Sequence, residues 1–387
     1  MKKVYLMTPG PTPVPPDALL SMAKPIIHHR TPEFMEIFKE VVANLKYVFQ
    51  TQGDVLLFTS SGTGAMEAAV ANLLSPGDKA ITVQGGKFGE RWTEICKAYG
   101  INAIPIDVEW GKAVEPQTIE AKLKEDSDIQ AVFTTLCETS TGVHTDIKSI
   151  AELTKKYKAV LAVDAISGLG AVDIKTDEWS VDCVVAGSQK GLMIPPGLAF
   201  VSLSKKAWEK VEKSKCPKYY FDFKLSKKAL EKMDTPFTPA VSLVVALRET
   251  LRMMKAEGLE VIFERHKKLA LATREAMKAM GLKLLAPTSP SDCVTAVKVP
   301  AGIDGEKLVK LMRDKYGVAI AGGQAELKGK VFRIAHMGFI RDTDILTTIS
   351  VLGMALAEMG YRGEPGVGVE AAEEVLLEGR ARAPIEP

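Results

Sequence analysis

Hydrophobic residues recur with two different spacings along this chain. After a proline-rich start at 8–16, apolar residues lie three and four positions apart from Phe34 to Leu45, which predicts an amphipathic helix that ends near Gln50. Short apolar runs then alternate with helical stretches such as 147–157. These runs occupy 55–58, 80–83, 131–133, 160–163, 181–185 and 199–203. Such runs are typical of strands buried on both faces, so we expect an α/β fold with a mostly parallel sheet between helices.

The second part of the chain repeats this pattern on a smaller scale. A helix-rich stretch at 241–280 is followed by a strand at 294–299, a helix at 305–316, a strand at 331–334 and a helix at 342–359. We expect a smaller α/β domain carried on a long helix. The resulting division is an N-terminal arm (1–17), a large domain (18–257), a small C-terminal domain (258–362) and a peripheral tail (363–387).

Composition and charge exclude several classes of protein. Lys plus Arg (50) nearly balance Asp plus Glu (48), so no overall field recruits nucleic acid or an anionic membrane. The five cysteines are far apart and form no CxxC pair, so neither a disulfide framework nor a metal site is expected. No apolar run approaches the ~20 residues of a membrane-spanning helix. The expected location is the cytoplasm, and any ligand should bind at the carboxyl ends of the strands.

Two charged residues stand at such strand ends. Asp164 follows the run 160–163, where an ionised carboxylate is either satisfied by local backbone or positioned for a ligand. Lys190 follows the run 181–185 and precedes another apolar segment. A solvated surface position is one interpretation of Lys190. A position in a cleft would lower its pKa and provide a neutral amine, which suggests a Schiff base.

Together these two residues resemble pyridoxal 5′-phosphate (PLP) chemistry, which pairs a Schiff-base lysine with an acidic partner of the pyridinium nitrogen. The segments 163–170 (VDAISGLG) and 187–190 (GSQK) resemble the class V aminotransferases, in the alanine–glyoxylate and serine–pyruvate branch of fold type I. The resemblance extends over nearly the whole chain. It implies PLP as the cofactor and Lys190 as the catalytic residue. Asp164, Ile166 and Gln189 would be cofactor contacts.

Three further segments resemble cofactor contacts of this family. The small-residue turn at 59–69 precedes a helix, and such a turn is either an ordinary cap or a phosphate site. Its similarity to the family's phosphate cradle favours the second. The aromatic residue of segment 85–92 corresponds to the residue that stacks on the cofactor ring, although simple packing is the alternative. A hydroxyl in segment 138–142 corresponds to the residue beside the ring hydroxyl. The residues implied are Ser61, Gly62, Thr63, Phe88 and Thr139.

Substrate binding is expected at Arg333. An arginine on an apolar strand keeps its proton and needs an anionic partner, either a carboxylate of the fold or the carboxylate of a ligand. The resemblance implies that Arg333 binds the α-carboxylate of the amino acid and that Gly10 helps to wall the pocket. Segment 235–239 resembles the stretch that reaches the phosphate of the neighbouring subunit, with Thr238 as the contact. This implies a homodimer with shared active sites.

The expected function is a PLP-dependent transaminase that moves an amino group from serine, alanine or aspartate to glyoxylate or pyruvate by ping-pong kinetics. A 2-aminoethylphosphonate–pyruvate transaminase would need additional cationic groups. A cysteine desulfurase would need a nucleophilic cysteine on a mobile loop, and neither Cys216 nor Cys293 has that setting. A non-catalytic PLP-binding regulator would usually carry a basic DNA-binding module, and a hydrogenase-associated subunit would need Cys-rich ligation. The sequence shows neither.

Overall fold

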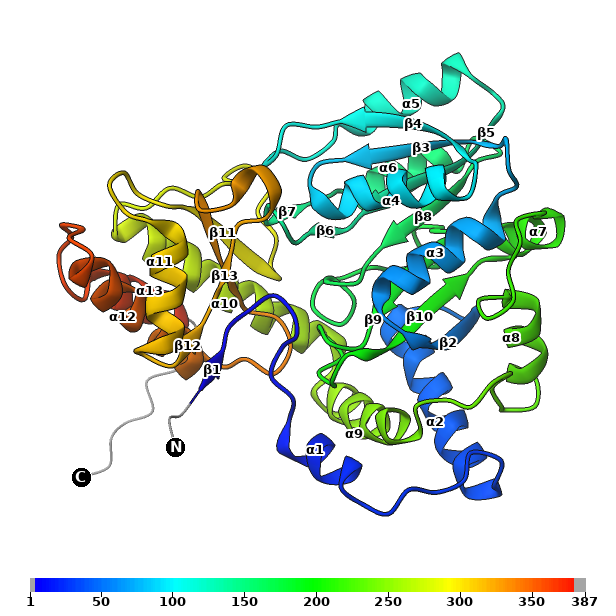
Figure 1. Ribbon diagram of the computed structural model, residues 1–387, viewed down its shortest axis with the longest axis horizontal. Helices are drawn as coiled ribbons and strands as arrows, with labels where there is room; N and C mark the ends of the chain where they lie inside the picture. The colour runs from blue at the N-terminus through cyan, green and yellow to red at the C-terminus, as the bar shows by residue number, and fades with distance from the viewer. Residues whose placement is uncertain (1–3, 379–387) are drawn as a thin grey trace.

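The central feature of the fold is a seven-stranded sheet in the larger of two α/β domains. The computed structural model describes residues 4–378 (Figure 1). In spatial order the strands are β2 (Asp54–Ser60), β10 (Gly197–Leu203), β9 (Cys183–Gly187), β8 (Val160–Asp164), β5 (Ile129–Thr135), β3 (Lys79–Gln84) and β4 (Asn102–Asp107). Strand β10 runs antiparallel to both of its neighbours, and the other pairs are parallel. The predicted mostly parallel sheet is confirmed.

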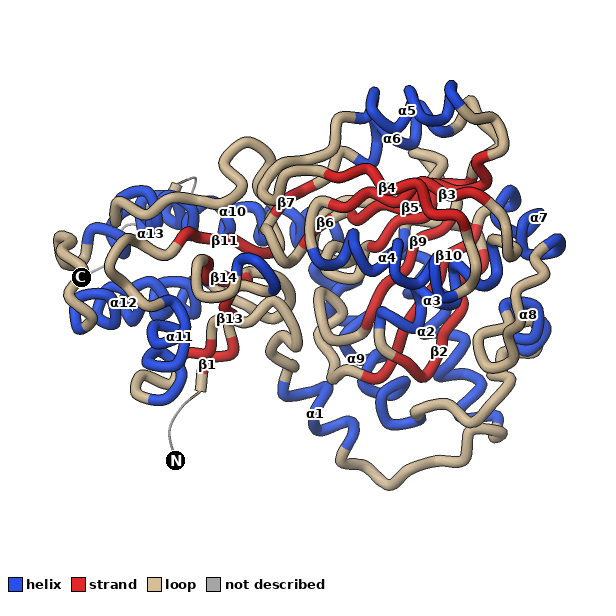
Figure 2. Tube along the Cα trace, turned by 45° about the horizontal axis from the view of Figure 1, so that its top comes forward, coloured by secondary structure: helices blue, strands red, loops and turns tan. Residues whose placement is uncertain are grey.

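Helices cover both faces of this sheet, as Figure 2 shows. The helices of this domain are α1 (Pro16–Met22), α2 (Pro32–Phe49), α3 (Gly62–Leu73), α4 (Lys87–Ala98), α5 (Pro116–Glu125), α6 (Ile147–Thr154), α7 (Lys205–Lys213), α8 (Phe223–Leu230) and α9 (Val241–Glu257). The strands and helices predicted for this part of the chain are present, with ends shifted by a few residues. Strand β4 and helices α1, α4, α5, α7 and α8 were not predicted individually.

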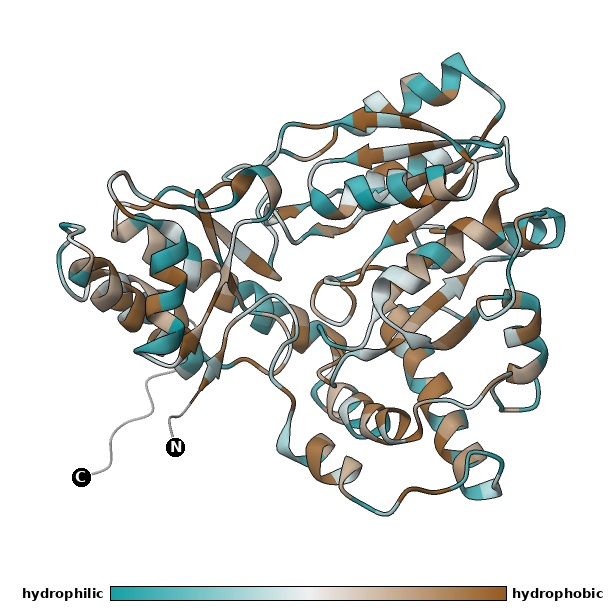
Figure 3. Cartoon of the chain, viewed as in Figure 1, coloured by the Kyte–Doolittle hydropathy of each residue, from teal (hydrophilic) through white to brown (hydrophobic). Residues whose placement is uncertain are grey.

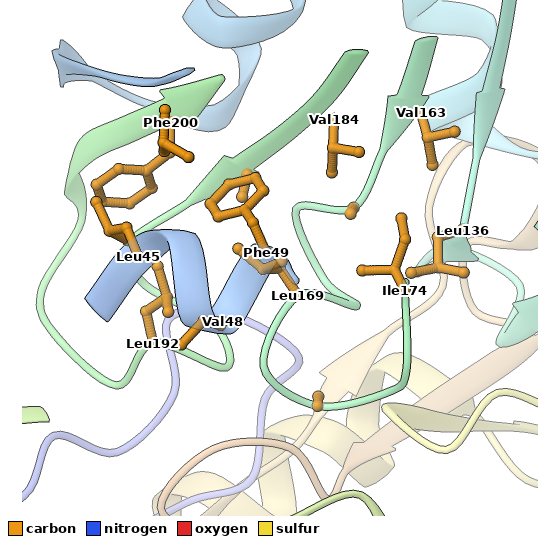
Figure 4. Packing of buried hydrophobic residues seen from close by; sticks show 14 of the residues in the cluster. Leu45, Val48, Phe49, Leu136, Val163, Leu169, Ile174, Val184, Leu192 and Phe200 are labelled. Carbon is orange, nitrogen blue, oxygen red and sulfur yellow. The ribbon is translucent and has the colours of Figure 1, made fainter. Parts of the chain in front are cut away.

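Alternate residues of each strand face opposite sides of the sheet and fill two separate cores. In β8, Leu161 and Val163 belong to one buried cluster, whereas Val160 and Ala162 belong to the other. Figure 4 shows the first cluster, in which Phe49 of α2 packs below the strands. The hydropathy colouring agrees, because the central strands are largely brown and the outer helix α5 is largely teal (Figure 3).

The small domain is built on helix α10 (Leu259–Ala279), which directly follows α9. Its three-stranded antiparallel sheet has the order β11 (Val294–Lys298), β14 (Val331–Ala335) and β13 (Ala321–Gly322). The remaining elements are α11 (Gly305–Asp314), β12 (Val318–Ala319), a 3-10 turn (Ala325–Leu327), α12 (Asp342–Glu358) and α13 (Val367–Leu377). The predicted strands and helices of this region are therefore present.

The N-terminal arm connects the two domains. Strand β1 (Tyr5–Leu6) pairs in parallel with β12, and Met7 is buried in the small-domain core. A few residues later, Thr12 donates its backbone N–H to the carbonyl of Gln189 (3.1 Å) and its hydroxyl to the carbonyl of Lys190 (2.9 Å). The arm thus passes directly over the lysine on which the expected chemistry depends.

Helix α13 lies in the segment expected to form a peripheral tail. Its residues Ala372 and Leu376 are buried in the same core as Ile349 and Leu352 of α12. We therefore propose that the small domain extends to residue 377. Residues 379–387 of the expected tail, and residues 1–3 of the expected arm, lie outside the described residues.

Candidate active site

The two residues expected to carry the chemistry come from neighbouring parallel strands. Asp164 is the last residue of β8, and Lys190 stands three residues beyond the end of β9. Because β8 and β9 are paired in parallel, their carboxyl ends meet at one edge of the sheet. Both side chains are buried, and each charge acts on the pKa of the other. The structure thus brings the predicted pair together.

The amine of Lys190 is enclosed by the N-terminal arm. Its Nζ donates a hydrogen bond to the backbone carbonyl of Pro9. A Cβ on Gly10 would lie 2.5 Å from both Nζ and Cε, so a residue without a side chain is required beside the amine. Burial lowers the pKa of Lys190 to about 8, which makes the neutral, nucleophilic form accessible near physiological pH.

Asp164 is a buried carboxyl group with one local donor. The backbone N–H of Ile166 donates to Oδ1 at 2.7 Å. Burial raises the pKa of Asp164 to about 7, and the charge of Glu138 acts in the same direction, while the charges of Lys190 and Arg91 oppose it. A buried carboxyl in this state is stabilised as the anion by a cationic N–H placed against it.

The turn before α3 has the features of an anion site. Ser61 occupies the N-cap position, but its side chain makes no capping hydrogen bond, so the first amides of the helix are left for another acceptor. Gly62 is packed against the side chain of Ile166, where a Cβ would lie 2.5 Å from Cδ1. The hydroxyl of Thr63 accepts a hydrogen bond from Arg91 Nη1 (3.1 Å), which places a cation beside the turn.

An aromatic residue and two polar residues complete this side of the site. Phe88, half-buried on the first turn of α4, has the guanidinium of Arg91 4.9 Å from its ring centroid. The hydroxyl of Thr139 lies 2.5 Å from that of Ser167. The side-chain oxygen of Gln189 is buried without a hydrogen-bond partner. A buried, unpaired acceptor fits a group supplied by a ligand.

Arg333 on β14 approaches from the small domain. It is 5% exposed and donates from Nε (2.9 Å) and Nη2 (2.7 Å) to the carbonyl of Gly322, and from Nη1 (2.9 Å) to the carbonyl of Thr139. Among residues 4–378 it forms no ion pair. Burial lowers its pKa to about 10, so the guanidinium remains charged at neutral pH. A salt bridge within the fold, the alternative considered from the sequence, is not observed among these described residues.

One predicted site residue lies apart from the others. Thr238 is exposed and lines a surface hollow with Thr59 and Phe237, and neither Lys190 nor Arg333 lines that hollow. Its expected contact is the phosphate bound to a second subunit, so the role of Thr238 stays a prediction.

Comparison with known proteins places the chain in a family. The profile of the family described as aminotransferase class-V matches residues 4–342. The chain belongs to the class V aminotransferases. A serine–glyoxylate aminotransferase from Methylorubrum extorquens is 37% identical over 97% of this chain and 96% of that protein. The solved structure of a ureidoglycine–glyoxylate aminotransferase from Bacillus subtilis is 31% identical, covers 97% of this chain and 98% of that one, and has a TM-score of 0.92.

A further relative bears a different kind of name. A protein from Synechococcus sp. named soluble hydrogenase, small subunit, is 48% identical and covers 97% of this chain and 98% of its own length. Within residues 4–378 no group of three or more His, Cys, Asp and Glu residues is arranged to hold a metal ion. The same residues contain no helix with the length and hydrophobicity of a membrane span.

Class V aminotransferases use PLP, and this chain is a PLP-dependent aminotransferase of fold type I. The observed residues fit the cofactor. They offer a buried amine, a buried carboxyl, an uncapped helix N-terminus beside a cation, and the unpaired oxygen of Gln189. Two residues of this site, Arg91 and Glu138, were not among the predicted contacts. Both lie inside the segments that carried the resemblance, but no local spacing indicated their bonds.

Proposed function

We propose that this aminotransferase moves the amino group of a small L-amino acid to glyoxylate, with pyruvate as the second candidate acceptor. The observation that carries the proposal is the buried, unpaired guanidinium of Arg333 next to the buried amine of Lys190. Besides burial, the charge of Arg333 lowers the pKa of Lys190, which supports placing the two groups in one site. Relatives named for glyoxylate support the choice of acceptor.

Arg333 is positioned to bind the substrate carboxylate. A guanidinium has five N–H groups, and three of them are held by the carbonyls of Gly322 and Thr139. One N–H on each terminal nitrogen therefore remains for a ligand. A carboxylate that accepts both would supply the charge that the fold does not, in the bidentate geometry that arginine favours.

Lys190 is proposed to act first as the point of cofactor attachment and then as a base. When bound, the cofactor supplies an aldehyde carbon that accepts an amine and a ring that takes up an electron pair. With the substrate amine in its place, the free Nζ of Lys190 would take the proton from the substrate Cα and return it. Asp164 would accept a hydrogen bond from the protonated ring nitrogen, and the first amides of α3 together with Arg91 would hold the phosphate.

A homodimer with shared active sites is part of the proposal. Thr238 is exposed, and the ring of the preceding residue, Phe237, packs against Tyr219 and Tyr220, which are 75% and 40% exposed. Exposed aromatic residues of this kind are enriched at protein interfaces. Sedimentation analysis tests this, and a monomer with full activity would contradict it.

The decisive experiment is a half-reaction. The PLP-loaded protein is mixed separately with L-serine, L-alanine, L-aspartate and 2-aminoethylphosphonate, and the visible absorbance of the bound cofactor is followed. Bleaching by a carboxylate donor, reversed by glyoxylate or pyruvate, is the expected result. Bleaching by 2-aminoethylphosphonate alone would favour the phosphonate alternative. Release of sulfide from L-cysteine would favour a desulfurase, although all five cysteines are buried.

A further inference from the structure

Helix α4, which carries Phe88, begins without a capping residue of its own. Its N-cap position is Gly86, and the first backbone N–H groups of a helix need acceptors from elsewhere. Glu138, fifty positions away, supplies them: its Oε2 accepts from the N–H of Phe88 (3.1 Å) and of Gly89 (2.9 Å). The hydroxyl of Ser140 accepts from the N–H of Lys87 (3.0 Å). The start of α4 is thus held entirely by another segment.

The packing at this junction leaves no room for a side chain at the cap. A Cβ on Gly86 would lie 2.5 Å from Glu138 Cδ and from Ser140 Oγ. Glu138 itself is 4% exposed and also accepts from the N–H (3.1 Å) and hydroxyl (2.5 Å) of Ser140. Burial raises the pKa of Glu138, and these hydrogen bonds act in the opposite direction. The carboxylate is therefore fixed by donors on both sides.

The same turn, 138–142, is also hydrogen-bonded to the small domain, which includes strand β14 with Arg333. The carbonyl of Thr139 accepts from Arg333 Nη1 (2.9 Å), and the carbonyl of Gly142 accepts from the N–H of Ser291 (2.8 Å) in the small domain. Gly142 has φ +73°, and a Cβ there would lie 3.1 Å from the backbone nitrogen of Ala296. The charge of Glu138 also favours the protonated form of Arg333.

We propose that Glu138 is a positioning residue that fixes the ring-stacking Phe88 and the carboxylate-binding Arg333 relative to each other through one shared turn. The part that concerns Phe88 depends only on cofactor binding, whereas the part that concerns Arg333 rests on the proposed function. Loss of the carboxylate should therefore change the setting of the bound cofactor and the affinity for the amino donor together.

The test compares Glu138→Gln with a matched control, Asp182→Asn. Glutamine keeps the volume of Glu138 but loses its charge and turns a donor toward the N–H of Ser140. Asp182 is likewise a buried carboxylate, which accepts from the N–H of Leu161 (3.0 Å) and the hydroxyl of Ser204 (2.8 Å) just before β9, at the opposite end of that strand from Lys190. The readouts are the visible circular dichroism of bound PLP, the Kd for PLP, and KM and kcat for the donor.

We expect Glu138→Gln to weaken PLP binding about tenfold, the loss typical of a hydrogen bond to a charged group. We also expect it to reduce the visible circular dichroism and to raise the KM of the donor, while Asp182→Asn leaves all three as in the wild type. Unchanged circular dichroism and KM in Glu138→Gln would overturn the proposal, as would equal changes in Asp182→Asn. If Glu138→Gln does not fold, Ser140→Ala, which removes one cap, should shift the same readouts by a smaller factor, and no shift would overturn the proposal.

The outcome is separable from that of the proposed function. If the wild-type protein binds PLP but no amino donor discharges it, the proposed substrates are wrong. The circular dichroism and PLP affinity of the two variants still test the role of Glu138, because neither measurement requires turnover.

Discussion

Replacing Arg333 by glutamine tests the central claim about substrate binding. The guanidinium is 5% exposed and meets only backbone carbonyls among residues 4–378, so a bound carboxylate would be its ionic partner. Removing one member of a buried ion pair costs roughly 3–5 kcal/mol. At about 1.36 kcal/mol per factor of ten, kcat/KM for the donor should fall by roughly 150- to 5,000-fold. Because the pKa of Arg333 is about 10, the wild-type guanidinium is charged at neutral pH. The full difference in kcat/KM between the wild type and Arg333→Gln should therefore be measurable at that pH.

The assay separates binding of the donor from binding of the cofactor. Steady-state kinetics with the donor identified in the half-reaction give kcat and KM, and absorbance titration gives the Kd for PLP. The effect should appear mainly in KM, because carboxylate binding is common to ground state and transition state. Arg333→Lys, which keeps the charge but loses the planar fork, should fall between the wild type and Arg333→Gln. An unchanged KM, or an equal loss of PLP affinity, would refute the reasoning.

Further outcomes follow from the same geometry. Lys190→Ala should fold but neither retain PLP through gel filtration nor turn over, and an active variant would remove the proposed role. Because burial lowers the pKa of Lys190 to about 8, the rate of PLP capture by the cofactor-free protein should rise with pH up to about 8 and then level, as measured by stopped-flow absorbance. Gly10→Ala should slow that capture, since its Cβ would lie 2.5 Å from Nζ, while Gly77→Ala, at a position that also has a positive φ (+91°, against +141° at Gly10) but open space, should not. Burial raises the pKa of Asp164 from 3.8 to about 7, so the folded state holds a proton that the unfolded chain releases. The free energy of unfolding of the cofactor-free protein should therefore fall by roughly 4 kcal/mol as pH rises between these values. Asp164→Asn should flatten that dependence in urea titrations, and an unchanged slope would contradict it.

Much of the sheet was predictable because its strands are buried on both faces. Such strands appear as continuous apolar runs, and β8 and β9 were found in this way together with the charged residues that follow them. Strand β4 was missed because Asn102, Pro105 and Asp107 interrupt its apolar pattern, as an edge strand with exposed positions permits. The antiparallel direction of β10 could not be predicted, because an apolar run does not indicate which way its strand runs in the sheet.

The sequence could nominate residues for the site but not the hydrogen bonds that connect them. Asp164 and Lys190 could be paired because strand ends converge. The bonds of Glu138 to the start of α4 join segments fifty positions apart, and a glycine at the cap gives no sign of a distant acceptor. The role of Thr238 could not be derived from the pattern of this chain either, because its expected contact lies in another subunit.

The path of the N-terminal arm matters for how this enzyme can be engineered. Its described residues, 4–17, contribute no strand to the central sheet, and the arm would seem a convenient place to trim the chain or attach a tag. Yet the carbonyl of Pro9 accepts a hydrogen bond from Lys190 Nζ, and the hydroxyl of Thr12 donates to the carbonyl of Lys190. Shortening the arm would therefore remove hydrogen-bond partners of Lys190 itself. The outer helix α5, at the edge of the large domain in Figure 1, is the safer place for a label or an immobilisation handle.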